Sequence, residues 1–274
     1  MLIFSTVVIL NKSNFEMKKI TPFMFIFFVG FVISIASLTS NKKNSSIVCK
    51  NFKLTKLSTK DIVDKKILDN SSLLRKAFNR VAGFNGRTYK RPITYYIHDE
   101  TGKKNFRLLP SKTNYTYEIS DDAERFIVDI FSKLDNYIDL DFKRVNSPRG
   151  AIIDIYKTKP PEDFSGYASM EWQGRPYKYR VEIAWKESEG KKLESYPTLS
   201  YVTAGTLIHE IGHALGLMHG EEYDTIDPYD KRFTRRDTMM SYNLPSCYLP
   251  EVDDFFSDVD INALRTVWGE EKGN

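Results

Sequence analysis

The residues best suited to chemistry lie in one short segment of the chain. Of four histidines, three fall within eleven residues: His209, His213 and His219. His209 and His213 are four positions apart, so on a helix their imidazoles share one face. Two imidazoles on one helix face can bind a single zinc ion. The spacing therefore predicts a metal site with Zn2+ as its cofactor.

The residues around these histidines suggest what such a metal would do. Gly216 permits a backbone turn that most residues avoid, so the chain can double back and bring His219 in as a third ligand. Three protein ligands leave one position open for water, which is typical of a catalytic rather than a structural zinc site. Glu210 lies one step round the helix and can reach that water without binding the metal. We expect Glu210 to act as general base.

The alternative is a core helix that contains histidines by chance. A motif fixing three histidines, one glutamate and one glycine arises in roughly a few sequence windows per million. Three histidines facing a core would also be costly to bury without a partner. Both considerations favour the zinc site.

A second motif follows at residues 237–242 (DTMMSY). The pattern H-E-x-x-H-x-x-G-x-x-H followed by a methionine turn resembles the metzincin clan of zinc metallopeptidases. The segment 209–217 (HEIGHALGL) is similar to the serralysin form, and 256–269 resembles the C-terminal helix shared by serralysins and matrixins. Serralysins usually have proline at the position of Gly220, and matrixins a second aspartate at that of Val259, so the subfamily stays open.

The resemblance implies roles for residues outside the histidine motif. Met240 would form a hydrophobic floor beneath the metal, although an ordinary core methionine would look the same. Tyr242 would be a displaceable zinc ligand that donates to the oxyanion, with a structural tyrosine as the alternative. Asp260 would support the methionine turn, or simply begin a helix. Residues 166–169 resemble the family's edge strand, which pairs with extended substrate.

Periodicity predicts the elements that position these residues. Ser120 is a plausible N-cap for a helix whose apolar positions continue to Ile138. A second helix is expected over 201–215, ending at Gly216, and a third from Ser257 through Val267. A short helix is possible at 73–81, and strands are expected at 93–98, 140–145, 151–156 and 181–185, the last half-buried. The fold class expected is α+β: a twisted mixed sheet with an active-site helix and a C-terminal helix.

The first forty residues have a different composition. Lys18 and Lys19 precede an apolar run at 22–38, as in a secretory signal peptide, although an uncleaved membrane anchor has similar length. Met17 is a possible alternative start. We therefore divide the chain into a leader or anchor at 1–40, a lead-in at 41–90 and a catalytic domain at 91–274, and expect a secreted protein that meets a membrane only if the leader is uncleaved.

Composition restricts the other function classes. The chain is 41% hydrophobic with a net charge of +4, and twelve Lys or Arg accompany three Asp between positions 50 and 91. No aromatic or glycine-rich nucleic-acid motif accompanies this excess, so we expect a solvated face and no nucleic-acid partner. Cys49 and Cys247 could form a disulfide or stay as thiols. His98 is expected at a surface or strand end rather than in catalysis.

These observations lead to one expected function, that of a secreted zinc-dependent metalloendopeptidase. We expect a monomer that cleaves internal bonds of a protein or peptide substrate, as the resemblance implies. The competing interpretations are a zinc-holding binding module without activity and a hydrolase of non-peptide amides or esters.

Overall fold

The structure is a computed structural model that describes the chain in separate stretches: residues 7–12, 79, 82, 91–104, 115–158, 165–173, 178–217, 234–235, 237–243 and 254–272. The apolar segment at 22–38, both cysteines and His219 lie outside these stretches. Of the helix predicted at 73–81, the structure describes Asn79 as helical. Among the described residues, no helix is long and apolar enough to span a membrane.

A mixed sheet of six strands forms the centre of the fold, in the order β1-β7-β8-β6-β2-β5. β7 and β8 pair antiparallel, and the other neighbours pair parallel. The strands are β1 (Val7–Lys12), β2 (Ile93–His98), β5 (Phe142–Arg144), β6 (Ile153–Lys157), β7 (Gly166–Gln173) and β8 (Lys178–Trp185). A separate antiparallel ladder joins β3 (Gly102–Lys103) to β4 (Tyr115–Thr116).

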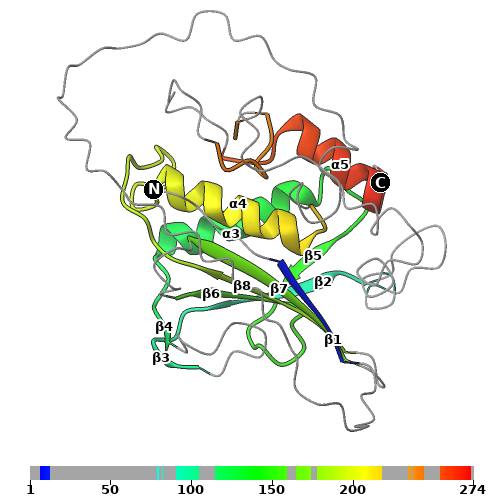
Figure 1. Cartoon of the computed structure of the whole chain (residues 1–274), viewed down its shortest axis with the longest axis horizontal. Helices are drawn as coiled ribbons and strands as arrows, with labels where there is room; N and C mark the ends of the chain where they lie inside the picture. Colours follow the sequence, from blue (N-terminus) through cyan, green and yellow to red (C-terminus); the bar gives the residue numbers. More distant parts are fainter. Residues whose placement is uncertain are drawn as a thin grey trace, which may run out of the picture.

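Three described helices accompany the sheet: α3 (Asp121–Leu134), α4 (Tyr201–Ala214) and α5 (Asp258–Trp268). Each begins at a serine whose side chain accepts a hydrogen bond from a backbone N–H of the first turn: Ser120, Ser200 and Ser257. Such caps satisfy donors that a helix leaves unpaired. α3 and α4 lie side by side over one face of the sheet, and α4 packs on β7 and β8 (Figure 1).

The core lies between this sheet face and the helices. Alternate residues of β2 point into it, namely Ile93, Tyr95 and Ile97, and Ile153 and Ile155 of β6 join them. Branched apolar side chains pack well on a pleated surface, and alternation places them on one face. The intervening residues of each strand therefore face away from the helices.

These elements confirm the α+β class in its general form, with a mixed sheet, the helix carrying the histidine motif and a C-terminal helix. The predicted boundaries were too long at two points. α3 ends at Leu134 rather than Ile138, which instead bridges Glu270, and the strand expected at 140–145 is ordered as β5 over three residues. Both shortenings follow from tertiary pairing that periodicity does not report.

Two predictions about the sheet were wrong. β8 is not half-buried, because Glu182, which faces away from the core, is 1% exposed. Residues 166–169 do not lie on an edge strand, because β1 pairs with β7 from Ala168 onward. β1 comes from the region assigned to the leader. The pairs with β1 begin at Ala168, after Gly166 and Tyr167.

Candidate metal centre

Helix α4 carries the central residues of the candidate site. Its residues from Thr203 to Ala214 are all buried, including His209, Glu210 and His213, each 0% exposed. The helix sits between the sheet on one side and the turn at 237–241 on the other, so its polar side chains are enclosed by protein. Buried imidazoles and carboxylates need specific partners, and these partners define the chemistry.

Backbone carbonyls hold both histidines by the same ring nitrogen. Nδ1 of His209 lies 2.6 Å from the Met239 carbonyl oxygen, and Nδ1 of His213 lies 2.8 Å from that of Leu217. A carbonyl oxygen only accepts, so each Nδ1 carries the hydrogen and donates it. This leaves Nε2 of each neutral ring as a lone-pair nitrogen, the state in which imidazole binds metal.

The two Nε2 atoms face each other at 3.1 Å. Two lone pairs at this distance repel unless a proton or a metal ion lies near them. Burial lowers the pKa of His213 to about 4, while its bond to the Leu217 carbonyl acts in the opposite direction, so a proton is disfavoured at neutral pH. Two nitrogens on one tetrahedral zinc, each at about 2.0–2.1 Å, would lie about 3.3 Å apart. The donor set therefore fits zinc.

The turn that should deliver a third ligand begins as expected. α4 ends at Ala214, and Gly216 has a φ of 100°, in the region that favours glycine. The Leu217 N–H donates back to the Gly212 carbonyl at 2.9 Å. His219 itself lies outside the described residues. Within the described stretches, no three His, Cys, Asp or Glu side chains group as a metal-ligand set.

Glu210 occupies the space between α4 and the start of β7. A Cβ added to Gly166 would lie 2.6 Å from Oε1 of Glu210 and 2.6 Å from Cγ2 of Thr206. The carboxylate is thus packed against the strand backbone, on the same helix as the two imidazoles. The sequence predicted that Glu210 neighbours the ligands; it did not predict its contact with Gly166.

The methionine turn is tied to α5 by one buried carboxylate. Asp260 accepts from the Thr238 hydroxyl at 2.6 Å and from the Met239 N–H at 2.9 Å. It also accepts from Ser257 in a capping box, so both alternatives considered for this residue hold together. Burial raises the pKa of Asp260, and the bonds to Met239, Thr238 and Ser257 oppose that rise. Because the Met239 carbonyl orients His209, this carboxylate supports a candidate ligand indirectly.

Met240 and Tyr242 lie close to the helix motif. A Cβ at Gly212 would be 3.0 Å from Sδ of Met240, which is 2% exposed, so this methionine packs directly under α4. The ring centroid of Tyr242 is 5.5 Å from that of His209, and its side chain is half-buried. The structure therefore brings His209, Glu210, His213, Met240 and Tyr242 together.

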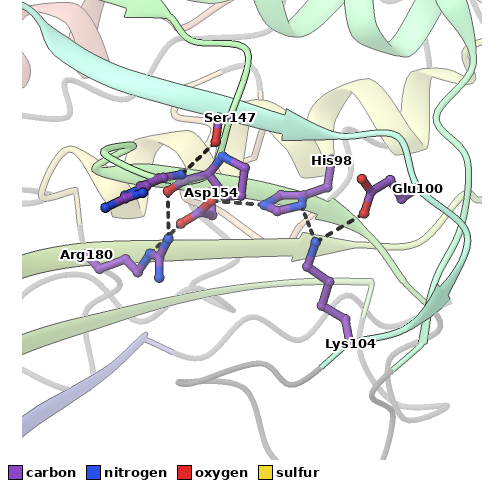
Figure 2. A network of polar contacts seen from close by, with 8 residues as sticks. His98, Glu100, Lys104, Ser147, Asp154 and Arg180 are labelled. Atoms are coloured by element: carbon purple, nitrogen blue, oxygen red, sulfur yellow. Dashed lines mark hydrogen bonds and ion pairs between the residues drawn. The ribbon is translucent and has the colours of Figure 1, made fainter.

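A second buried histidine lies away from this centre. Nε2 of His98 bonds Oδ1 of Asp154 at 2.9 Å, and Lys104 lies 2.9 Å from its Nδ1 (Figure 2). Arg180 bonds the other carboxylate oxygen at 2.5 Å. His98 is 0% exposed, so it stands at the end of β2 as expected but is not a surface residue. Of the two positions expected, the strand end is the one found, and polar partners from β6 and the β3 region enclose the ring there.

This network was missed, although the sequence held a weak signal. His98 and Asp154 occupy outward-facing positions of predicted strands, and Arg180 immediately precedes a third, where alternation suggests solvent. The parallel register that places His98 beside Tyr156 and Asp154 beside Glu182 comes from the fold. The available hint was that three ionisable residues fall on the same face of neighbouring strands.

No family model matches the chain, and the search of curated proteins found no match. The function must therefore be argued from the site.

Proposed function

We propose that the chain is a zinc-dependent metalloendopeptidase of metzincin type. The observation that carries the proposal is the pair of buried imidazoles on α4, whose Nε2 atoms lie 3.1 Å apart with both Nδ1 atoms held by carbonyls. A buried carboxylate, Glu210, adjoins this pair on the same helix. Ligands oriented by outer hydrogen bonds beside a carboxylate are the parts that hydrolytic zinc sites use.

In this proposal His209, His213 and His219 hold the metal. When bound, zinc polarises the scissile carbonyl and lowers the pKa of its water toward about 7. Glu210 accepts a proton from the attacking water and returns it to the leaving amine nitrogen. The Tyr242 hydroxyl donates to the oxygen on which negative charge develops. Met240 and Asp260 fix the turn beneath the ligands.

The proposal extends to the protein's setting. The substrate is an extended protein or peptide chain cleaved at internal bonds, and nucleic acid is not a partner. The chain acts as a secreted monomer if the leader at 1–40 is removed, or on the outer side of a membrane if the segment at 22–38 anchors it.

The decisive experiment compares wild-type protein with Glu210→Gln. We expect wild-type protein to hold one zinc per chain and to hydrolyse casein, with activity lost to a chelator and restored by Zn2+. Glu210→Gln should keep zinc and stability but lose about 10²–10⁴-fold in activity, the usual contribution of a general base. Elemental analysis and thermal unfolding of both proteins are the controls.

Other results point to other functions. Zinc bound without hydrolysis of casein or esters would indicate a binding module. Ester hydrolysis without peptide hydrolysis would indicate a non-peptide hydrolase. Casein hydrolysis by Glu210→Gln within about tenfold of wild type would remove Glu210 from the mechanism.

A further inference from the structure

Gly166, the first residue of β7, lies directly against Glu210 and Thr206 of α4. A Cβ at this position would lie 2.6 Å from Oε1 and 2.8 Å from Cγ of Glu210, and 2.6 Å from Cγ2 of Thr206. Real Cβ atoms are not found this close to other heavy atoms. The strand and helix therefore meet here in a way that only a residue without a side chain allows.

Backbone conformation gives no separate reason for glycine at this position. Gly166 is not among the glycines with positive φ, such as Gly216 and Gly269. Two residues further along the same strand face, Ala168 carries a Cβ and is fully buried in the core. The separation of β7 from α4 thus accommodates a methyl group at 168 but not at 166, where Glu210 fills the space.

Hydrogen bonds on both sides of Gly166 hold β7 and Thr206 in place, so neither can easily move away from an added Cβ. On the strand side, Gly166 pairs with Trp185 of β8, and the Lys186 N–H donates to the Ser165 carbonyl at 3.0 Å. On the helix side, the Thr206 hydroxyl donates to the Val202 carbonyl at 2.9 Å, which fixes the rotamer that aims Cγ2 at the strand. Of the groups in contact with this position, the Glu210 side chain is the most flexible and would move first.

We propose that Gly166 is a positioning residue for Glu210: its missing side chain creates the seat in which the carboxylate rests between β7 and α4. This inference rests on the proposed function, because the seated group is the general base. A methyl group at 166 displaces the carboxylate from its place beside the ligands while leaving His209 and His213 in position. Catalytic groups lose effectiveness steeply with displacement, about 10²-fold for about 1 Å.

The test uses the full zinc-loaded chain and four variants. Gly166→Ala places a Cβ too close to both Glu210 and Cγ2 of Thr206. Gly166→Ala/Thr206→Ser removes the close contact with Cγ2 while keeping the hydroxyl. Thr206→Ser alone is the background control. Gly205→Ala is the matched glycine control. Gly205 lies on the same helix as Glu210, but its new Cβ would meet Nη1 of Arg235 at 2.5 Å instead of Glu210.

We expect Gly166→Ala to lower kcat by about 10- to 100-fold, with KM within about twofold of wild type and zinc content unchanged. The double variant should regain thermal stability but not kcat, because the contact with Glu210 remains. Thr206→Ser and Gly205→Ala should keep wild-type kcat. A structural role alone predicts instead that kcat recovers together with stability.

A second readout does not need activity. The 13C carboxyl resonance of Glu210, identified by its loss in Glu210→Gln at one fixed pH, should move in Gly166→Ala and in the double variant but not in Gly205→Ala. If wild-type protein cleaves peptides while neither kcat nor this resonance changes in Gly166→Ala, the inference is overturned and the proposed function stands. If the resonance moves but wild-type protein cleaves nothing, the seat stands and the proposed function fails. Recovery of both kcat and the resonance in the double variant would also overturn the inference.

Discussion

Two buried histidine clusters lie on opposite faces of the sheet, and their ring nitrogens are used differently. His98 has a side-chain partner at each nitrogen: Lys104 at Nδ1 and Asp154 at Nε2. Lys104 only donates, so Nδ1 accepts and Nε2–H donates to the carboxylate. On the helix side, His209 and His213 each donate a hydrogen bond from Nδ1 to a backbone carbonyl, and their Nε2 atoms face each other. In the first cluster both ring nitrogens are bonded to side chains, whereas in the second two lone-pair nitrogens face each other.

Burial alone does not separate the two clusters. His98 and His213 are both 0% exposed, and desolvation lowers the pKa of each. The difference lies in the partner of the second nitrogen, which fixes the tautomer and so the capacity to bind metal. The comparison therefore predicts that equivalent substitutions in the two clusters affect different properties.

The largest difference is expected in metal binding. His213→Ala should weaken zinc binding by more than about 10³-fold, because it removes one ligand from a site whose total is about 10–16 kcal/mol. His98→Gln should leave zinc affinity unchanged within about threefold. Competition with a chromophoric chelator measures both. Equal weakening by the two substitutions would break the distinction between the clusters.

The next effect concerns the far face. Asp154→Ala should lower the free energy of unfolding by about 3–5 kcal/mol, because it leaves His98 and the Arg180 cation beside an empty acceptor position. Because the Arg180 side chain is 23% exposed, water can partly solvate it, and we expect a loss in unfolding free energy near the lower end of this range. Urea unfolding of the zinc-free protein measures the loss, and zinc affinity should not change. A loss below about 1 kcal/mol would show that solvent replaces this carboxylate.

On the helix side, Tyr242→Phe should lower kcat by about 10²–10³-fold, the usual cost of removing one oxyanion donor. KM, zinc content and the unfolding temperature should stay near their wild-type values, since the ring that lies 5.5 Å from His209 is kept. A fall in stability without a fall in kcat would assign the hydroxyl a structural hydrogen bond instead.

The sequence predicted the helix side well because its signals are local. Ser120, Ser200 and Ser257 cap their own helices within one turn, and the spacing of His209 and His213 needs only one helix. The role of Asp260 reached across 22 positions to Thr238, and the resemblance rather than periodicity suggested it. Local patterns therefore located the candidate ligands, and the resemblance to a known motif suggested the turn.

The far face could not be predicted in the same way. His98 and Asp154 are 56 positions apart, and their contact depends on the register between β2 and β6. Alternation on β8 also suggested solvent around Glu182, which is buried. Sequence periodicity reports which residues share a face, but not what covers that face. The same limit applies to β1, whose pairing with β7 joins segments far apart in the chain.

The smallest predicted effect is the pH dependence of the free energy of unfolding that arises from His98 and its partners Asp154 and Lys104. Burial lowers the pKa of His98, while its bond to Asp154 raises it and nearby Lys104 lowers it further. The unfolded chain therefore takes up a proton at higher pH than the folded protein does. The stability that neutral His98 contributes is complete above its ordinary pKa of 6.5 and is lost as the pH falls from there toward the lower folded pKa.

The charged groups around His98 determine how stable its protonated form is in the folded protein. Protonation would place a hydrogen on Nδ1 facing the Lys104 ammonium, with Asp154 on the other side and Glu100 3.6 Å from the lysine. Urea unfolding of zinc-free wild type and His98→Gln between pH 5.5 and 7.5 isolates the effect, because His209 and His213 contribute equally to both. The difference should favour wild type more at high pH, with a slope of at most about 1.4 kcal/mol per pH unit. Parallel curves would mean that His98 has the same proton affinity folded and unfolded, and that its ring nitrogens are not both bonded to side chains.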